Sequence, residues 1–207
     1  MSDVRLYDYP RSSASYRVRI ALALAGIDYQ SVRVDLLTGE QQLAEHRARN
    51  PQGFVPVLEI DGRRLTQSLA IVEYLNETRE LYLLPDEPAE RAQVRALAHA
   101  IAVDVHPVCN LSVVKRATGG EEPARTTWMR DFIGPGLAAF ETLLARFEQN
   151  PFCTGDTVSL ADICLIPQLY NADRWGAEHA ACRRILRAAA GCALHPAFIA
   201  AHPDASS

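Results

Sequence analysis

Lysine is almost absent from this chain of 207 residues, because Lys115 is the only lysine among 21 basic side chains. The 25 acidic residues outnumber these bases, so the formal net charge is −4 at neutral pH. A mildly acidic chain without a block of like charges argues against nucleic-acid binding as its main role. No uncharged apolar run is long enough to cross a bilayer, and we therefore expect no membrane span.

Cysteine is also sparse. Five cysteines occur, all in the second half of the chain, and none forms a Cys-x-x-Cys motif. Their odd number and scattered positions argue against a disulfide framework, and no cluster with His or Asp indicates a metal site. Most lie in apolar stretches, which predicts buried, reduced thiols. They are Cys109, Cys153, Cys164, Cys182 and Cys192.

The N-terminal residues contain no apolar segment of the kind that a signal peptide needs. Acidic and basic side chains are interspersed in MSDVRLYDYPRSS instead, and we expect a cytoplasmic protein. With 48% hydrophobic and 22% charged residues, the chain has the composition of a globular protein. Its length allows one domain or two.

The first half of the chain alternates strand and helix patterns. Residues 4–9 alternate polar and apolar side chains, residues 13–25 carry apolar stripes at helical spacing, and residues 29–34 form a second strand pattern. A strand, a helix and a strand within about thirty residues predict a right-handed crossover with parallel pairing.

A hairpin and a helix follow. Residues 55–60 and 63–65 are separated by Asp61-Gly62, a dipeptide that favours a type I′ turn. The next helix begins near Ser68 and continues with apolar side chains at helical spacing. The order strand, helix, strand, helix, strand, strand, helix is that of a thioredoxin-like α/β domain, which we place at residues 1–84.

The second half of the chain is helical in pattern throughout. Two prolines and two acidic residues within 84–88 separate it from the first half, and we place an all-α helical bundle at residues 89–207. An apolar stripe from Val94 to Val108 predicts one long helix kinked near Pro107. Residues 201–207 lack periodicity and are expected to fray. Further helices are expected around 137–147, 160–169 and 180–190.

Three segments carry the residues of a ligand site. The first is the hydroxyl-rich turn Arg11-Ser12-Ser13, at the start of the first helix. Free N–H groups and the helix dipole favour an anion such as a thiolate there, and a hydroxyl donates a hydrogen bond to it. The alternative is that Ser12 or Ser13 only caps the helix, and the two roles are compatible.

The second and third segments begin a strand and a helix. Val55-Pro56 at the start of a strand fits a cis peptide bond. Such a bond turns the preceding backbone amide and carbonyl outward, where they can pair with an extended peptide ligand. Gln67-Ser68 at a helix start offers a carboxamide, a hydroxyl and backbone N–H groups to a carboxylate. Each segment has a purely structural alternative, since proline often opens strands and serine often caps helices.

The segment from Arg11 to Leu22 reads RSSASYRVRIAL and resembles the zeta-class glutathione S-transferase signature SSCSWRVRIAL, found in maleylacetoacetate and maleylpyruvate isomerases. Shorter similarities extend it to about residue 176. They are Asn50-Pro51, Val55-Pro56, Gln67-Ser68-Leu69-Ala70-Ile71, Asn110-Leu111-Ser112-Val113, Gly155-Asp156 and the segment from Ala161 to Gln168. The resemblance implies a glutathione S-transferase fold in a homodimer, and a glutathione-dependent cis–trans isomerase of aromatic amino acid catabolism.

The resemblance also implies roles for individual residues. Ser12, with Ser13 beside it, would be the catalytic hydroxyl that faces the glutathione sulfur. Arg174 would bind a carboxylate of a small dicarboxylate substrate, and Arg11 would supply a second cation for that substrate. The other glutathione-binding positions are Gln41, Val55, Pro56, Gln67, Ser68, His106, Asn110, Leu111 and Ser112.

Several of these residues have alternative interpretations. His106 precedes Pro107, and its alternative is that it donates a hydrogen bond with a purely structural role. For Arg11 and Arg174 the alternative is that each is an ordinary surface arginine. The pattern from Ser159 to Asp162 is interpreted as a capping box that folds a helix. Alternative functions are a transferase or dehalogenase of small α-halo acids, and a glutathione-binding protein without turnover.

Two departures from the family pattern are informative. Ala14 replaces the family cysteine, which excludes thiol-dependent chemistry at this position. Residues 176–182 replace the acidic turn and Tyr-Pro that are usual in the family. The sequence therefore leaves the substrate undecided between maleylacetoacetate, maleylpyruvate and a related acid.

Overall fold

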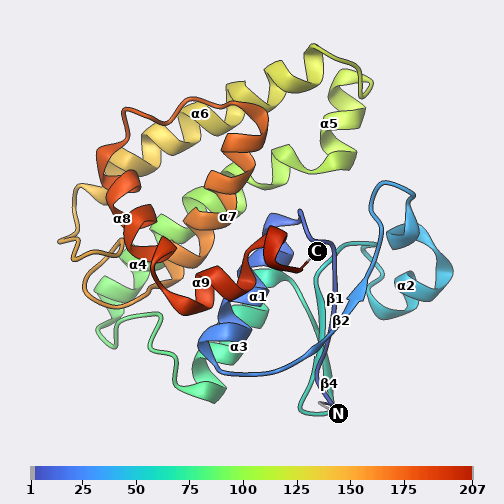
Figure 1. The fold of residues 1–207 in the computed structure, drawn as a ribbon, viewed down its shortest axis with the longest axis horizontal. Helices are drawn as coiled ribbons and strands as arrows, with labels where there is room; N and C mark the ends of the chain where they lie inside the picture. The colour runs from blue at the N-terminus through green and yellow to red at the C-terminus, as the bar shows by residue number, and fades with distance from the viewer. Residues whose placement is uncertain (1–2, 207) are drawn as a thin grey trace. The chain divides into compact units, whose positions relative to one another are not determined.

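The structure is a computed structural model that describes residues 3–206. Its internal contacts divide the chain into two compact units, which Figure 1 shows as ribbons. Unit 1 comprises Met1–Leu81 together with Pro196–Ser207, and unit 2 comprises Tyr82–His195. The first unit contains a sheet and the second is helical, as the sequence predicts.

Unit 1 is built on a four-stranded mixed sheet in the order β2-β1-β3-β4. β1 pairs in parallel with β2 and antiparallel with β3, and β3 pairs antiparallel with β4. The parallel pair is connected through helix α1 (Ser13–Leu24), which confirms the predicted crossover. The strands are β1 (Arg5–Asp8), β2 (Gln30–Arg33), β3 (Val57–Ile60) and β4 (Arg63–Thr66).

The hairpin between β3 and β4 turns where the sequence predicts. Asp61 and Gly62 have φ angles of 53° and 67°, and a type I′ turn requires positive φ at both central residues. Glycine adopts this conformation without strain, and aspartate tolerates it better than most residues. The turn fixes the register in which Val57 lies opposite Thr66.

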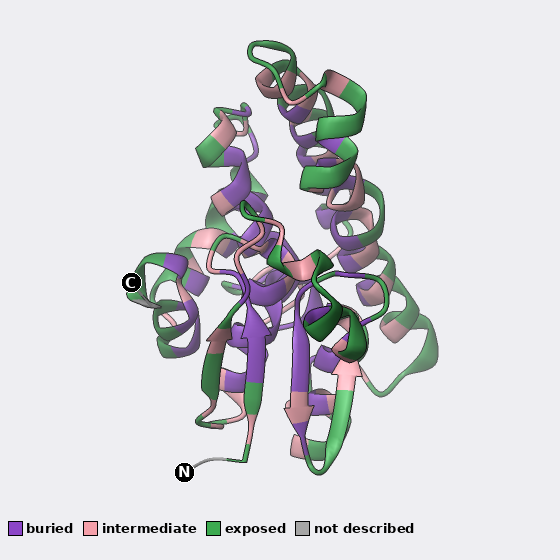
Figure 2. Ribbon diagram, turned by 90° about the vertical axis from the view of Figure 1, so that its right-hand side faces the viewer, coloured by how far each residue is buried: buried purple, intermediate pink, exposed green. Residues whose placement is uncertain are grey.

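Helices cover both faces of the sheet. α1 packs against α3 (Ser68–Arg79) on one face, and the short α2 (Ala44–Arg49) lies on the other (Figure 1). On the α2 face, the Arg49 guanidinium lies 4.5 Å from the centre of the Tyr7 ring. Figure 2 shows the central strands as mostly buried, and Leu58 is fully enclosed.

The end of the chain returns to unit 1. Helix α9 (Pro196–Ala201) packs against α1, and Arg19 Nε donates a hydrogen bond to the Ala201 carbonyl at 3.0 Å. These contacts group residues 196–207 with the first half, whereas the sequence analysis assigned 89–207 to the helical domain. The other division, after Leu81, lies close to the predicted connector.

The last residues also differ from expectation. A 3₁₀ turn (Pro203–Ser206) follows α9, and the rings of Tyr16 and His202 meet edge to face with centres 6.1 Å apart. The expected fraying is therefore wrong for residues 201–206. Local periodicity misses it because α1, far away in sequence, supplies the surface on which these residues pack. Ser207 lies outside the described residues.

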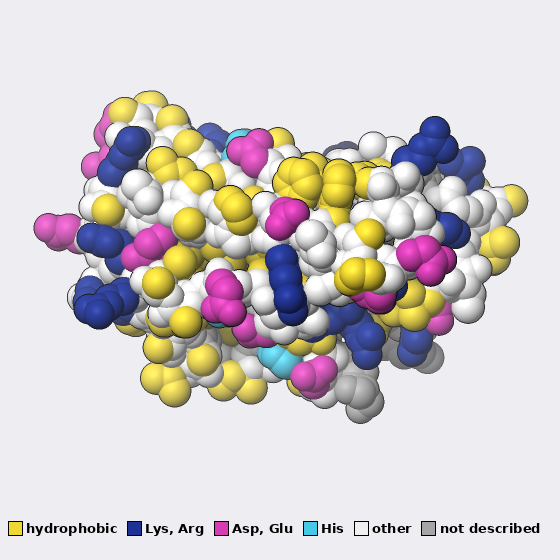
Figure 3. All heavy atoms as spheres, turned by 90° about the horizontal axis from the view of Figure 1, so that it is seen from above, with side chains coloured by type: hydrophobic (Ala, Val, Ile, Leu, Met, Phe, Trp, Pro, Cys, Tyr) yellow, Lys and Arg dark blue, Asp and Glu magenta, His cyan; other side chains and the backbone are white. Residues whose placement is uncertain are grey.

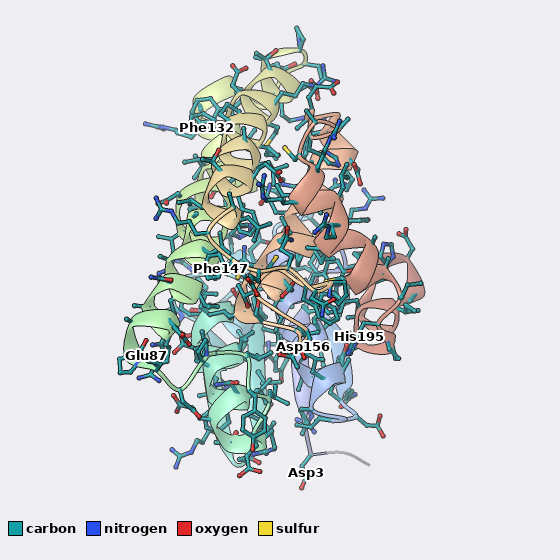
Figure 4. All side chains as sticks on the ribbon, turned by 90° about the vertical axis from the view of Figure 1, so that its left-hand side faces the viewer. Asp3, Glu87, Phe132, Phe147, Asp156 and His195 are labelled. Carbon is teal, nitrogen blue, oxygen red and sulfur yellow. The ribbon has the colours of Figure 1, made fainter. Side chains whose placement is uncertain are left out.

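Unit 2 confirms the predicted all-α half. Its first helix begins as the connector predicts, since Pro88 occupies the first turn and Glu87, labelled in Figure 4, accepts the backbone N–H of Glu90 at 2.7 Å. The elements are α4 (Pro88–His99), a π-helical segment (Ala100–Val105), a 3₁₀ turn (Pro107–Cys109), α5 (Leu111–Thr118), α6 (Ala124–Leu144), α7 (Leu160–Trp175) and α8 (Arg183–Ala193).

The expected single helix from Val94 to Val108 is interrupted. The chain leaves α-helical geometry at Ala100 rather than at Pro107, although most of the apolar stripe is buried as expected. A Cβ on Gly136 of α6 would collide with the Val105 side chain, so glycine permits the close approach of α6 to the π-helical segment. In a π-helix the backbone hydrogen bonds join residues five apart instead of four, which widens the helix locally. The spacing of apolar residues does not reveal this change, and the sequence therefore predicted a regular helix.

The expected helix 180–190 is α8, which begins later, at Arg183. Glu141 of α6 sets this start, because its carboxylate accepts the backbone N–H groups of Arg184 at 3.0 Å and of Ile185 at 2.9 Å. A cap supplied by another helix leaves no local signal in the sequence. The boundary could therefore not be located from the pattern of α8 alone.

The start of α7 is the predicted capping box. Asp162 is fully buried and accepts hydrogen bonds from the Ser159 backbone N–H at 2.9 Å, the Ser159 hydroxyl at 2.6 Å and the Cys153 N–H at 2.9 Å. Burial raises the pKa of Asp162, and these donors oppose the rise. The network joins the loop before α7 to the first turn of the helix.

All five cysteines are buried and free, which confirms the predicted buried thiols. Burial raises the pKa of the Cys109 thiol to about 12 and that of Cys153 well above its ordinary value. A thiol that stays protonated at neutral pH is a poor nucleophile. These two side chains therefore act as small apolar groups.

Charged side chains of both signs are interspersed on the face that Figure 3 shows, in line with the mixed charge of the sequence. Within residues 3–206, no group of three or more His, Cys, Asp or Glu side chains has an arrangement that could hold a metal ion. Over the same range no single helix has the length and apolar character to cross a membrane. One bent pair of helical segments, Pro88–Cys109 with Leu111–Thr118, reaches the length and apolar composition of a span when the two are taken together.

Candidate active site

Three segments that the sequence singles out lie at one end of the sheet of unit 1. β1 ends just before the Ser12 turn, and β3 begins just after Val55-Pro56. Because β1 and β3 are antiparallel, these two loops leave the same end of the sheet. β4 runs antiparallel to β3 and ends just before Gln67-Ser68, which therefore joins them.

Ser12 is the N-cap of α1, and its Oγ accepts the backbone N–H of Ser15 at 3.2 Å. The capping role that the sequence left open is therefore present. Accepting this bond uses only a lone pair of the oxygen, so the hydroxyl hydrogen remains available as a donor. Ser12 is partly exposed, whereas Ser13 beside it is buried. Ser12 is thus the more accessible hydroxyl of the pair.

The neighbours of Ser12 in the turn are Arg11 and Ala14. Arg11 is exposed between β1 and α1, where its long side chain is accessible to solvent. Ala14, in the first turn of α1, is partly exposed. Around the start of α1 the chain therefore presents a hydroxyl and a cation.

The Val55–Pro56 peptide bond is cis, as the sequence predicts. The carbonyl just before Val55, that of Phe54, accepts hydrogen bonds from His46 Nε2 at 2.9 Å and from Asn50 Nδ2 at 3.0 Å. His46 and Asn50 are both buried and belong to the last turns and the end of α2. α2 therefore anchors the loop that carries Val55.

Gln41 lies in a 3₁₀ turn (Glu40–Gln42) against the same loop. A Cβ on Gly53, whose φ is 65°, would lie 3.0 Å from the Gln41 carbonyl, so glycine allows this approach. The Gln41 Oε1 atom is buried and has no hydrogen-bond partner among residues 3–206. A buried acceptor of this kind suits a peptide N–H from a bound ligand.

Gln67 and Ser68 form the start of α3. Gln67 has φ 68° and ψ 111°, a conformation that residues other than glycine rarely adopt and that is frequent at ligand sites. Its Nε2 donates to Gln52 Oε1 at 2.8 Å, and the buried Ser68 Oγ accepts a hydrogen bond from Arg17 Nη1 at 3.1 Å. Since the first N–H groups of a helix lack partners within it, the start of α3 retains donors for an anion.

A second group of predicted residues lies in unit 2, where the turn after the π-helical segment leads into the first residues of α5: His106, Asn110, Leu111 and Ser112. Asn110 is the N-cap residue of α5, and the two residues after it are exposed in the first turn. The Val108 carbonyl in this turn accepts the indole N–H of Trp128 at 2.9 Å. α6 thereby anchors the turn.

Arg174 lies in the last turn of α7 and is exposed. Its guanidinium carbon is 5.9 Å from the centre of the Trp175 ring, and that of Arg125 from α6 is 5.2 Å from the same ring. Arg130, also from α6, donates from Nε to the Trp175 carbonyl at 2.8 Å. Cations are favourable at a helix C-terminus, and these contacts hold the end of α7 beside Arg174.

Sequence reasoning missed the supporting contacts of three residues: Arg17, His46 and Trp128. The signature contains Arg17, which is the only sequence signal for it. The others act through contacts between segments that are separate in sequence, such as Trp128 with Val108. Local patterns carry no signal for such contacts.

Family models identify the class to which both units belong. The model of the glutathione S-transferase N-terminal domain matches residues 2–77, and that of the glutathione S-transferase C-terminal domain matches residues 126–202. These matches span most of both units. The chain belongs to the glutathione S-transferase family.

Within this family, its relatives include proteins named as maleylacetoacetate and maleylpyruvate isomerases. The chain is 58% identical over 203 residues to a maleylacetoacetate isomerase of Rhizobium meliloti, which covers 96% of this chain and 95% of the relative. A solved maleyl pyruvate isomerase, described as a bacterial zeta-class glutathione S-transferase, superposes with a TM-score of 0.92 at 36% identity over 97% of both chains.

A further solved relative contains ligands. The maleylacetoacetate isomerase of Methylobacterium extorquens, with bound malonate and glutathione, has a TM-score of 0.90 at 40% identity over 97% of both chains. The zeta-class resemblance that the signature carries is thereby confirmed, and glutathione is the cofactor of this class.

Proposed function

We propose that this protein is a glutathione-dependent cis–trans isomerase of maleylacetoacetate or maleylpyruvate. The observation that carries the proposal is the Ser12 hydroxyl at the N-terminus of α1, with its hydrogen available as a donor. A donor and a helix dipole at the same point favour a bound thiolate. Relatives named as these isomerases support the same reaction.

Unit 1 has groups that fit glutathione. Val55 would pair through its backbone with the cysteinyl part, beside Pro56, and Gln67 and Ser68 would hold the γ-glutamyl α-carboxylate. The buried acceptor Oε1 of Gln41 would receive a peptide N–H towards the glycyl end. We also propose glutathione-binding roles for four residues of unit 2, His106, Asn110, Leu111 and Ser112. The start of α3 supports the assignment of Gln67 and Ser68, because it retains backbone N–H donors for the γ-glutamyl α-carboxylate.

When bound, glutathione supplies a thiolate that adds reversibly to the cis double bond, which becomes a single bond, rotates and re-forms as the thiolate leaves. Ser12 holds the sulfur as an anion by donating its hydroxyl hydrogen. Thiols at helix N-termini have pKa values of about 3.5–7.5, so the start of α1 favours ionisation at neutral pH. Ser13, buried beside Ser12, completes the hydroxyl pair of this helix start.

Arg174 and Arg11 are proposed to bind the substrate carboxylates. A guanidinium forms two parallel hydrogen bonds to a carboxylate, which fixes a small dicarboxylate in orientation. Nearby cations also stabilise the negative charge that develops on the substrate carbonyl. Malonate, a small dicarboxylate bound in the Methylobacterium extorquens relative, supports this substrate class.

We also propose that the protein acts as a homodimer in the cytoplasm, in aromatic amino acid catabolism. The family resemblance supports the dimer and the pathway. Five buried free thiols agree with a reducing compartment. Sedimentation equilibrium checks the dimer, and a monomer at micromolar concentration would contradict it.

Isomerisation of maleylpyruvate and of maleylacetone, each with and without glutathione, tests the proposed activity. We expect turnover only when glutathione is present, and we expect glutathione to be recovered unchanged. Turnover without glutathione would contradict the proposal. So would the absence of turnover on both substrates by protein that binds glutathione, and halide release from a small α-halo acid would then identify a dehalogenase.

A further inference from the structure

Helix α1 carries two buried arginines, Arg17 and Arg19, each 2% exposed. Arg19 donates to the Asp8 carboxylate at 2.7 Å and to the carbonyls of Pro10 at 2.9 Å and Ala201 at 3.0 Å. Burial raises the pKa of Asp8, and the Arg19 guanidinium opposes this rise. Arg19 is thus a structural anchor whose charge is balanced by a carboxylate of the chain.

Arg17 makes a different contact. Its Nη1 donates to the Ser68 hydroxyl at 3.1 Å, across 51 residues of sequence, and Ser68 is itself only 6% exposed. The guanidinium therefore lies at the first residue of α3, where it adds a full positive charge to the partial charge of the helix N-terminus. Such a pair in a buried environment is electrostatically stronger than it would be in water.

The contact also decides what Ser68 can do. A serine hydroxyl has one hydrogen to donate and two lone pairs that accept, and arginine only donates. Once a lone pair of Ser68 Oγ is occupied by Arg17, the oxygen is polarised towards donating its own hydrogen. Ser68 is thereby prepared for an acceptor such as a carboxylate.

We propose that Arg17 is a positioning residue for the γ-glutamyl α-carboxylate of glutathione, acting through the Ser68 hydroxyl and through its buried charge. The inference rests on the proposed role of Ser68 in glutathione binding. It adds to that role a residue that the ligand does not need to touch. It also gives a reason for an arginine at this position of α1, one turn after the helix start that holds Ser12.

The test compares two ligands in calorimetry, glutathione and an analogue in which γ-aminobutyrate replaces the γ-glutamyl residue, so that the α-carboxylate is absent. The Arg17→Met variant should bind glutathione about tenfold to thirtyfold more weakly, the loss expected for a hydrogen bond to a charged group. Its affinity for the analogue should stay within about twofold of the original protein. Arg17→Lys keeps the charge and should recover part of the glutathione affinity.

Arg19→Lys is the matched control, because it changes the other buried arginine of α1. It should lower the melting temperature and change the affinity for the two ligands by the same factor. If Arg17→Met lowers the affinity for both ligands by the same factor, or for neither, Arg17 serves only the fold and the inference is wrong.

A double-mutant cycle with Ser68→Ala covers the case in which Arg17→Met is poorly folded. Arg17→Lys should then cost less affinity for glutathione in the Ser68→Ala background than alone, since the contact through which it acts is gone. Equal costs would overturn the inference. Binding is measured without an isomerisable substrate, so a failure of the isomerase proposal leaves this result intact, and wild-type protein that does not bind glutathione would refute both.

Discussion

The two units hold their proposed functional residues in different ways. In unit 1 the site is made from backbone and short side chains at strand and helix ends, supported by buried groups such as His46 and Arg17. In unit 2, Arg174 and the first turn of α5 present exposed side chains, supported by Trp128 and other contacts from α6. One site is built into the fold, and the other projects from it.

This difference indicates which kind of ligand each unit is suited to bind. A ligand bound by backbone groups is recognised as long as the fold is intact, so unit 1 suits a constant cofactor. Long exposed side chains at helix ends are replaced with little effect on the fold, so unit 2 suits a substrate that differs between relatives. The departure of residues 176–182 from the family pattern, directly after α7, fits this division.

The largest effect should follow from Asp162→Ala, which damages the fold of unit 2 rather than its exposed site. The change leaves the buried N–H groups of Ser159 and Cys153 without an acceptor. Removing a buried, hydrogen-bonded carboxylate should lower the free energy of unfolding by about 3–5 kcal/mol, measured by urea denaturation.

Asp156→Ala is the matched control for that variant, since Asp156 is exposed in the same loop and is labelled in Figure 4. Its effect should stay within about 0.5 kcal/mol. A loss of less than about 1 kcal/mol in Asp162→Ala would show that the capping network does not stabilise unit 2.

The next effect should be that of Ser12→Ala, which tests whether the helix start in unit 1 does more than cap. We expect kcat to fall about a hundredfold at neutral pH, because one preorganised donor to a reacting anion is lost. The pKa of the bound thiol should rise, as followed by the ultraviolet absorbance of the thiolate against pH. Its stability should fall by about 1 kcal/mol, the usual value of an N-cap.

Ser159→Ala sharpens the contrast between the units, because Ser159 is the N-cap of α7. It should lose about the same stability, roughly 1 kcal/mol, and leave the thiol pKa unchanged. An unchanged pKa of the bound thiol in Ser12→Ala would show that Ser12, like Ser159, only caps its helix.

The smallest effect should come from Arg174→Gln in the exposed site of unit 2. We expect KM for a dicarboxylate substrate to rise about tenfold, with stability and glutathione affinity preserved, because one exposed charge-assisted contact is lost. Arg146→Gln, at an exposed arginine just after α6, is the control and should leave KM unchanged. A fall in glutathione affinity in Arg174→Gln would contradict the separation of substrate binding from glutathione binding.

Local sequence patterns predicted the features whose physical causes are local. The Asp61-Gly62 turn, the start of α1 at Ser13 and the capping box at Ser159 each depend on residues within a few positions of one another, and each is present. The parallel crossover from β1 to β2 and the β3–β4 hairpin were predicted in the same way, and the signature motif pointed to the family.

The features that could not be predicted depend on tertiary contacts. α8 begins where Glu141 of α6 caps it, and the end of the chain packs where α1 offers Arg19 and Tyr16. The π-helical segment from Ala100 has the same apolar spacing as a regular helix. In the candidate site, the contact of Arg17 with Ser68 joins two motifs that the sequence shows only separately.

The return of α9 to unit 1 has a consequence for protein synthesis. The carbonyl of Ala201 that Arg19 needs is translated only after the whole of Tyr82–His195, which takes on the order of ten seconds at typical elongation rates. During this interval the nascent α1 exposes the surface that later receives α9. Unit 1 is therefore completed only after unit 2 has been translated, and its maturation depends on the arrival of α9 more than on the time since residues 1–81 emerged.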